Sequence, residues 1–309
     1  MQRIITIGTR GSRLALAQAR GVRRGLEKRF PRALFETVII KTTGDEFQSV
    51  ELFKKNDTGV FTKAIERKLL SREIDIAVHS LKDLPTRTAR GLTLAAFPRR
   101  LDTRDALISR GRFDLHSLPK GAAVGTGSLR RKRQILRVRP DLRLKDVRGN
   151  LDTRIAKVLE KRDLDAVIVA RAGLLRLKKY LRYARPIPAE ELLPAVGQAA
   201  LGLEARKNDH AVLRMLKTLN DPRTERTVTA ERQFLKTLRG GCRVPVGIHS
   251  RIQGMTLRLQ AAVFSVKTDQ VLEDELSGPA KDAERLGVRL ARRLLQKGAG
   301  KLLAEARKS

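Results

Sequence analysis

The 309-residue sequence has one cysteine, no tryptophan, only two tyrosines, and no apolar run of about 20 residues. The lone cysteine, Cys242, cannot form an internal disulfide, and the lack of a long apolar run excludes a membrane-spanning helix. The first residues, MQRIITIGTRGSRLAL, contain no apolar segment followed by a small-residue cleavage site, so we expect no secretory signal. Together these features predict a cytoplasmic protein.

Acidic residues are also scarce, because 33 Asp and Glu stand against 66 Lys and Arg, which gives a net charge of +33. Arginine supplies 44 of the basic residues. Its planar guanidinium binds carboxylates and phosphates, so we expect anionic partners. The basic residues are spread along the whole chain and only 4% of residues are aromatic, so stacking surfaces for single-stranded nucleic acid are few. Charge permits non-specific nucleic-acid binding, but it does not by itself separate nucleic acid, anionic metabolites and compositional bias.

The sequence does have enough apolar residues, 41%, to exclude wholesale disorder, and its length predicts two or three domains. Over the first 200 residues, short apolar runs alternate with amphipathic stretches, which is typical of parallel sheets covered by helices. Ligands bind such sheets at the loops that follow the carboxyl ends of the strands. The expected strands are 3–9, 35–40, 74–78, 122–124, 142–147 and 166–170, and the expected helices are 12–30, 59–70, 128–138 and 151–161.

The pattern changes after Asp221 and Pro222. We expect a helix at 222–238, two strands at 247–252 and 256–266, and a helix at 280–296. This order is typical of an α+β arrangement and predicts a separate, smaller C-terminal domain.

Three loops combine small residues with arginine directly after an expected strand. Small residues let backbone N–H groups approach an anion at a helix N-terminus, and the guanidiniums add charge-assisted hydrogen bonds. Alternatively, Gly and Ser are ordinary loop and capping residues and Arg is an ordinary surface residue. The recurrence at three strand ends favours anion binding, and none of the loops has the spacing of a nucleotide-binding motif. The loops are 9–12 (TRGS), 125–131 (GTGSLRR) and 148–154 (RGNLDTR).

Asp83 follows Lys82 at the end of the strand expected at 74–78. A carboxylate beside a lysine stays ionised and can stabilise a developing cation, although Asp83 could equally cap a turn before Pro85. His79 is interpreted as a packed strand residue rather than a ligand. The four histidines have no metal-ligand spacing, so no metal site is expected.

Cys242 lies in a Gly-Gly loop between Arg239 and Arg243. Two flanking cations favour the thiolate and the glycines give access to it, whereas an isolated cysteine is commonly inert. No nearby His or Asn could orient it as in a cysteine hydrolase.

Six segments in order resemble the porphobilinogen deaminase (hydroxymethylbilane synthase) family. They are TRGSRLALAQA, DIAVHSLKDLPT, VGTGSLRRKRQI, VRGNLDTRIAKV, LPAVGQAALGLEAR and VTAERQFLKTLRGGCRVPVG. The resemblance implies an α/β fold in which two lobes like those of type II periplasmic binding proteins, with mixed sheets, precede a small α+β C-terminal domain. The implied domains are 1–98 completed by about 198–219, then 99–197, then 220–309.

The family makes hydroxymethylbilane for tetrapyrrole and heme biosynthesis by adding four porphobilinogens head to tail, with loss of ammonia at each step. The resemblance implies that Cys242 carries a dipyrromethane cofactor through a thioether, and that Asp83 is the catalytic aspartate that stabilises cationic, azafulvene-like intermediates. It also implies positions that bind acetate and propionate side chains. For the cofactor these positions are Lys82, Ser128, Arg130, Arg131, Arg148 and Gly149, and for the substrate they are Arg10, Ser12, Arg154 and Arg176.

The chain departs from the family at Thr58, where lysine is usual, and at Ala199, where glycine is common. We expect a monomer that acts on porphobilinogen, without membrane or nucleic-acid partners. Two other classes remain as alternatives. A non-catalytic anion-binding module would need neither Cys242 nor Asp83. A nucleic-acid-binding protein, which only the charge supports, would bind random DNA with steep salt dependence.

Overall fold

The computed structural model describes residues 3–41, 62–240 and 244–308. Its contacts form two compact units, Met1–Arg100 with Ala200–Glu225, and Leu101–Ala199 with Arg226–Ser309. Cys242, Thr58 and the first residues of the helix expected at 59–70 lie outside the described residues. No helix in the described ranges is long and apolar enough to cross a membrane.

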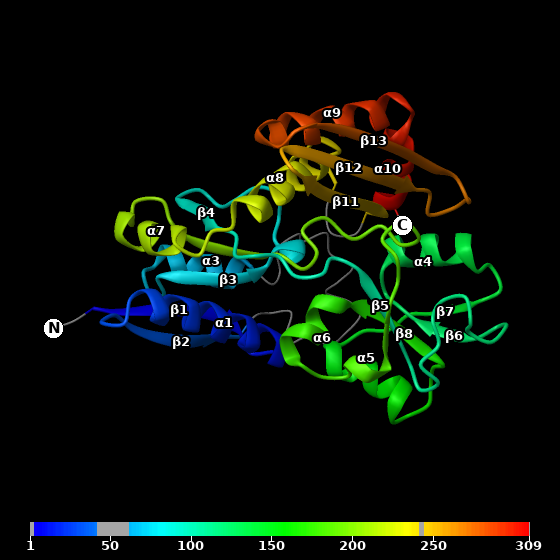
Figure 1. Ribbon diagram of the computed structural model, residues 1–309, viewed down its shortest axis with the longest axis horizontal. Helices are drawn as coiled ribbons and strands as arrows, with labels where there is room; N and C mark the ends of the chain where they lie inside the picture. The colour runs from blue at the N-terminus through cyan, green and yellow to red at the C-terminus, as the bar shows by residue number, and fades with distance from the viewer. Residues whose placement is uncertain (1–2, 42–61, 241–243, 309) are drawn as a thin grey trace. The chain divides into compact units, whose positions relative to one another are not determined.

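The described part of the first unit contains a mixed sheet with strand order β2-β1-β3-β10-β4 (Figure 1). β1 is parallel to β2 and β3, whereas β10 is antiparallel to β3 and β4. Ala19, Val22 and Leu26 recur on one face of α1 and pack in the core beside strand residues such as Ile7 and Val78. The elements are β1 (Ile4–Arg10), α1 (Arg13–Arg29), β2 (Leu34–Ile40), α3 (Lys63–Leu70), β3 (Ile76–Ser80), η1 (Leu81–Asp83), β4 (Leu92–Ala96), β10 (Leu201–Arg206) and α7 (His210–Lys217).

The second unit contains a sheet with order β7-β6-β8-β5-β9. β6 is parallel to β7 and β8, and β5 is antiparallel to β8 and β9. The elements of this part are β5 (Asp105–Ser109), β6 (Ala123–Gly125), α4 (Leu129–Val138), β7 (Arg143–Lys145), α5 (Leu151–Leu159), β8 (Ala166–Ala170), α6 (Arg171–Leu177), η2 (Leu181–Tyr183) and β9 (Ala184–Pro186).

A separate antiparallel sheet, β11-β12-β13, completes the second unit. Leu286, Leu290 and Leu294 form an apolar stripe on α9 that packs in one core with Leu257 and Leu259 of β12. Figure 1 draws α9 and α10 against this sheet. The elements are α8 (Pro222–Thr237), β11 (Val246–Gln253), β12 (Thr256–Phe264), β13 (Val271–Pro279), η3 (Ala280–Asp282), α9 (Ala283–Gln296) and α10 (Ala299–Lys308), with α8 beginning in the first unit.

The fold class implied by the resemblance is confirmed, since two mixed α/β sheets accompany a small α+β part. The sheets are mixed, as the resemblance implies; the alternating pattern alone indicated parallel sheets, because β5 and β10, which run against their neighbours, do not stand out in it. β13 is a further strand that the pattern does not predict, because its residues alternate between half-buried and exposed and include several acids.

Candidate functional site

In the first unit, the predicted site residues gather at one edge of the sheet. β1 and β3 are parallel neighbours, so their carboxyl ends lie at the same edge. β1 ends at Arg10, and Ser12 then caps α1, because its Oγ accepts a hydrogen bond from the Ala15 N–H at 3.2 Å. β3 ends at Ser80 and leads directly into η1, which carries Lys82 and Asp83.

Asp83 itself is exposed, and its carboxylate accepts no hydrogen bond from the residues that the structure describes. The turn is closed instead by the Leu84 N–H, which donates to the Leu81 carbonyl at 3.2 Å. The capping interpretation of Asp83 therefore lacks a hydrogen bond to support it. The segment before it is firmly held, since the Gln18 amide donates to Ser80 Oγ at 2.9 Å.

His79 is a packed strand residue, as predicted. It is buried in β3, and its Nε2 lies 3.0 Å from Oε2 of Glu204, which is buried in β10. The partner of His79 in the core is therefore the Glu204 carboxylate.

In the second unit, β6, β7 and β8 are parallel and again bring three strand ends to one edge. After β6, Ser128 caps α4 by accepting the Arg131 N–H at 3.4 Å. After β7, the chain passes through the exposed Arg148 and then Gly149, whose φ of +103° favours glycine. Arg154 Nε donates to the Gly149 carbonyl at 2.8 Å and so holds this loop. The capping interpretation thus applies to Ser128, whereas Arg148 and Arg154 place cations at the loop that leads to α5.

After β8, α6 carries Arg176, whose Nη2 donates to the Ala199 carbonyl at 2.6 Å. Burial lowers the pKa of Arg176 to about 10, so it remains a cation at neutral pH. This half-buried guanidinium is bonded to a carbonyl rather than to an acid, so its hydrogen-bond partner does not neutralise its positive charge.

Arg130 and Arg131 are placed differently from the other arginines, because both are buried and share one acid. Arg130 Nη2 donates to Asp105 Oδ2 at 2.8 Å, and Arg131 Nη2 donates to Asp105 Oδ1 at 2.7 Å. Their Nη1 atoms donate to the carbonyls of Leu193 and Ile168. Burial would raise the pKa of Asp105, but the two guanidiniums outweigh it and hold that pKa well below its usual range.

Asp105 is the buried partner of two predicted site residues, and no sequence pattern had pointed to it. The available signal was an aspartate that begins a run, DALIS, in which every residue is buried. An ionisable residue in such a run needs a partner.

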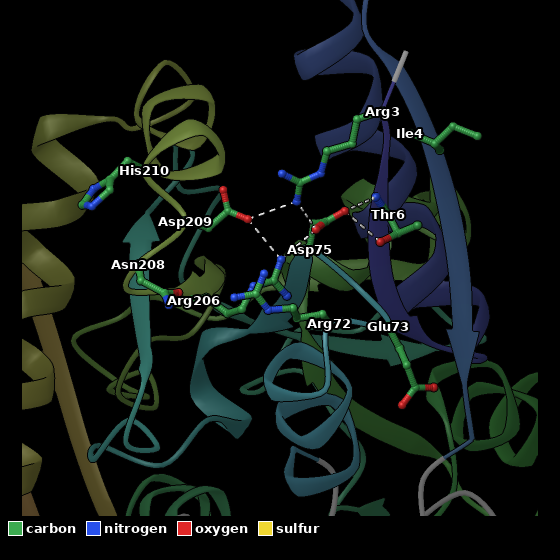
Figure 2. A pocket seen from close by; sticks show the side chains of 10 residues that line it. All are labelled: Arg3, Ile4, Thr6, Arg72, Glu73, Asp75, Arg206, Asn208, Asp209 and His210. Carbon is green, nitrogen blue, oxygen red and sulfur yellow. Dashed lines mark hydrogen bonds and ion pairs between the residues drawn. The ribbon is translucent and has the colours of Figure 1, made fainter. Parts of the chain in front are cut away.

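A polar pocket of about 530 Å³ lies at the opposite end of β1 in the first unit (Figure 2). In it, Asp75 accepts hydrogen bonds from Arg3 at 2.6 Å, Arg206 at 2.7 Å and the Thr6 N–H at 3.0 Å. Asp209 bonds both arginines at 3.1 Å. These arginines are already paired with acids, so their ion pairs stabilise the unit. The pocket lies away from the site residues predicted at the carboxyl ends of β1 and β3.

Two family models match the chain. The dipyromethane cofactor binding domain of porphobilinogen deaminase matches residues 5–214, and the C-terminal domain of porphobilinogen deaminase matches residues 225–296. Porphobilinogen deaminases from Desulforudis audaxviator (strain MP104C) and Chlorobaculum tepidum are 48% and 44% identical, over 99% and 100% of this chain and 99% and 100% of their own lengths. The one from Geobacter metallireducens is 46% identical over 97% of this chain and 94% of its own length.

Similarity to solved structures is much weaker. A putative methionine-binding lipoprotein from Bacillus subtilis is 14% identical, with a TM-score of 0.42 over 70% of this chain and 89% of that one. The extended matches to family models and relatives decide the assignment: the chain belongs to the porphobilinogen deaminase family, a family of transferases with a dipyrromethane cofactor.

Proposed function

We propose that Asp83 carries the chemistry of a hydroxymethylbilane synthase, which joins four porphobilinogen molecules head to tail. The observation that carries the proposal is an exposed carboxylate placed at a sheet edge otherwise supplied with cations, Arg10 and Lys82. A carboxylate there does not help to bind an acidic substrate, so its value must lie in another step.

That step is the loss of ammonia. When the amine leaves porphobilinogen, positive charge develops on the pyrrole, and a fixed anion stabilises it more in the transition state than in the ground state. Asp83 is suited to this role because its carboxylate is exposed and accepts no hydrogen bond from a described residue.

The acetate and propionate side chains of the substrate need cations and hydroxyl donors. We assign these to Arg10 and Ser12 in the first unit and to Arg154 and Arg176 in the second. Ser12 uses an oxygen lone pair to cap α1, which leaves its O–H able to donate. Arg176 is hydrogen-bonded to a carbonyl rather than to an acid, so its charge is available.

The residues also fit the dipyrromethane cofactor, whose side chains are carboxylates. The relevant observation is the Nε of Arg131, which is buried and has no hydrogen-bond acceptor among the described residues. We assign cofactor carboxylates to Lys82, Ser128, Arg130, Arg131, Arg148 and Gly149, and the covalent thioether to Cys242. When bound, the cofactor supplies an anchor to which the growing chain stays attached.

We further propose three domains, 1–98 with about 198–219, 99–197, and 220–309. The enzyme would act in the cytoplasm as a monomer without a nucleic-acid partner. Sedimentation tests the oligomeric state. Titration with random DNA at two salt concentrations tests the last point, because tight binding at physiological salt would contradict it.

The function is tested by supplying porphobilinogen to the purified chain and measuring ammonia and hydroxymethylbilane together. Four ammonia molecules should appear for each tetrapyrrole released. Substrate with esterified carboxylates should react poorly, because the arginines then lose their charged partners. Full reaction of the ester would contradict the assigned arginines, and no ammonia release from the free acid would contradict the function.

A further inference from the structure

The buried carboxylate of Asp105 organises two arginines at one sheet edge of the second unit. Its side chain is fully buried at the start of β5. Oδ2 accepts from Arg130, and Oδ1 accepts from Arg131 and also from the Gln198 amide at 2.9 Å. Gln198 Nε2 also donates to the Thr103 carbonyl at 2.7 Å, which fixes the amide in place. Both carboxylate oxygens are therefore bonded and the acid stays ionised.

The charge of this cluster does not balance. Two guanidiniums surround one carboxylate, so one positive charge is left over in a buried place. Both arginines also lie in the first turn of α4, where the helix dipole adds positive potential. Net charge of this kind is costly to bury unless an anion completes the cluster.

A second observation identifies the unfilled position. Within the residues that the structure describes, Arg131 Nε is a buried donor without an acceptor. Its two terminal nitrogens are already used by Asp105 and by the Ile168 carbonyl at 2.9 Å. The unused donor thus belongs to one of the two guanidiniums that share the excess charge.

We propose that Asp105 is a positioning residue, which clamps Arg130 and Arg131 so that the pair retains one positive charge for one carboxylate of the pyrrole ligand. Without the acid, two adjacent guanidiniums would repel each other and separate. With a second acid, the pair would be neutral and would have no charge left for the ligand. This inference rests on the proposed function, since it takes the ligand to carry acetate and propionate groups.

The test compares Asp105→Asn and Asp105→Glu with the parent enzyme and with Asp163→Asn, which removes an exposed acid from the same unit. The readouts are the covalent cofactor mass in the folded protein, KM, kcat and Tm. We expect folded Asp105→Asn to carry less than half of the parent's covalent cofactor. In its loaded fraction kcat/KM should fall about tenfold or more, because the displaced arginines no longer hold the cofactor in its place. Asp163→Asn should match the parent.

A merely structural role for Asp105 would lower Tm but leave the cofactor content and kcat/KM of the folded protein unchanged, and that result would overturn the proposal. If Asp105→Asn does not fold, Asp105→Glu decides. It keeps the charge but displaces it by one methylene, so a parental kcat/KM and cofactor content in that variant would also overturn the proposal.

A binding readout without turnover uses a Cys242→Ser background. Porphobilinogen should raise Tm in that background and should raise it much less when Asp105→Asn is added. Failure of the function itself is distinguishable, because the parent enzyme would then lack both cofactor mass and turnover.

Discussion

At the residue scale, Asp83 is an exposed carboxylate that follows a lysine and accepts no hydrogen bond from a described residue. Asp83→Asn keeps the size but removes the charge, so we expect kcat to fall by at least about 10²-fold while substrate binding changes little. Asp83→Glu keeps the charge in a displaced position and should retain part of the activity. Single-turnover assays with bound species resolved by mass would measure both, with Glu36→Gln as the exposed-acid control. If the Asp83→Asn variant turned over at the parent rate, Asp83 would be a turn residue with no catalytic role.

A second prediction at the residue scale concerns Arg130, whose loss should lower the stability of the folded unit. Arg130→Leu removes the donor to Asp105 Oδ2 and one donor to the Leu193 carbonyl, while Arg131 still balances the charge of Asp105, so the free energy of unfolding of the unit should fall by about 1–3 kcal/mol. Arg133→Leu, on the more exposed side of the same helix, should change it by no more than about 0.5 kcal/mol. Denaturant unfolding of both variants measures the difference. If both variants lost the same free energy of unfolding, the Arg130–Asp105 pair would contribute no more to stability than an arginine on the exposed side of the helix.

At the element scale, the turn that leads into β10 contains Ala199 with a φ of +69°. A left-handed alanine costs about 1–2 kcal/mol, and the added freedom of an unfolded glycine offsets about 0.5–1 kcal/mol of that. The Ala199 methyl is also buried and its loss offsets much of this gain, so Ala199→Gly should raise the free energy of unfolding by up to about 0.5 kcal/mol. Gly121→Ala, at a φ of +70° with open space around it, should lower it by about 0.5–1 kcal/mol. A destabilised Ala199→Gly protein would contradict this account of the turn.

The elements that carry the strand-end loops could be predicted from sequence, because apolar runs followed by Ser or Asn caps are local signals. Ser12, Ser128 and Asn150 all cap the helices that follow them. β5 and β10 could not be ordered into the sheets this way, because antiparallel pairing depends on residues far away in the chain. For the same reason the sequence did not show the partner of Arg130, because Arg130 lies on α4 and Asp105 lies 25 residues earlier, on β5.

At the scale of the whole molecule, paired acids should set the resistance to low pH. Burial would raise the pKa of Asp75, but hydrogen bonds from Thr6, Arg3 and Arg206 hold it below its usual range, and Asp105 behaves likewise. The unfolded chain, with aspartate pKa values near about 3.9, then binds more protons than the folded one at acid pH.

The stability contributed by these acids should accordingly be complete above about pH 5 and be lost as the pH falls below about 4. Tm measured against pH checks this, and Asp75→Asn should show a lower Tm at neutral pH with a shallower fall toward acid. An Asp75→Asn protein with the parent's acid slope would contradict the pairing in Figure 2.

Ion pairs across the whole molecule also explain part of the large excess of arginine. Arg3, Arg206 and Arg139 are paired with acids away from the predicted site, so part of the arginine content stabilises the units. Composition alone could not separate these structural arginines from those assigned to carboxylate binding. The separation requires knowing which acids lie beside them.

The central claim, that this chain builds and keeps a covalent dipyrromethane on Cys242, is tested most directly by the intact mass of the purified protein. We expect an excess over the sequence mass equal to one covalently bound dipyrromethane, and no such excess in Cys242→Ser. An active protein with the bare sequence mass, or a Cys242→Ser variant that kept the excess and turned over, would contradict the claim.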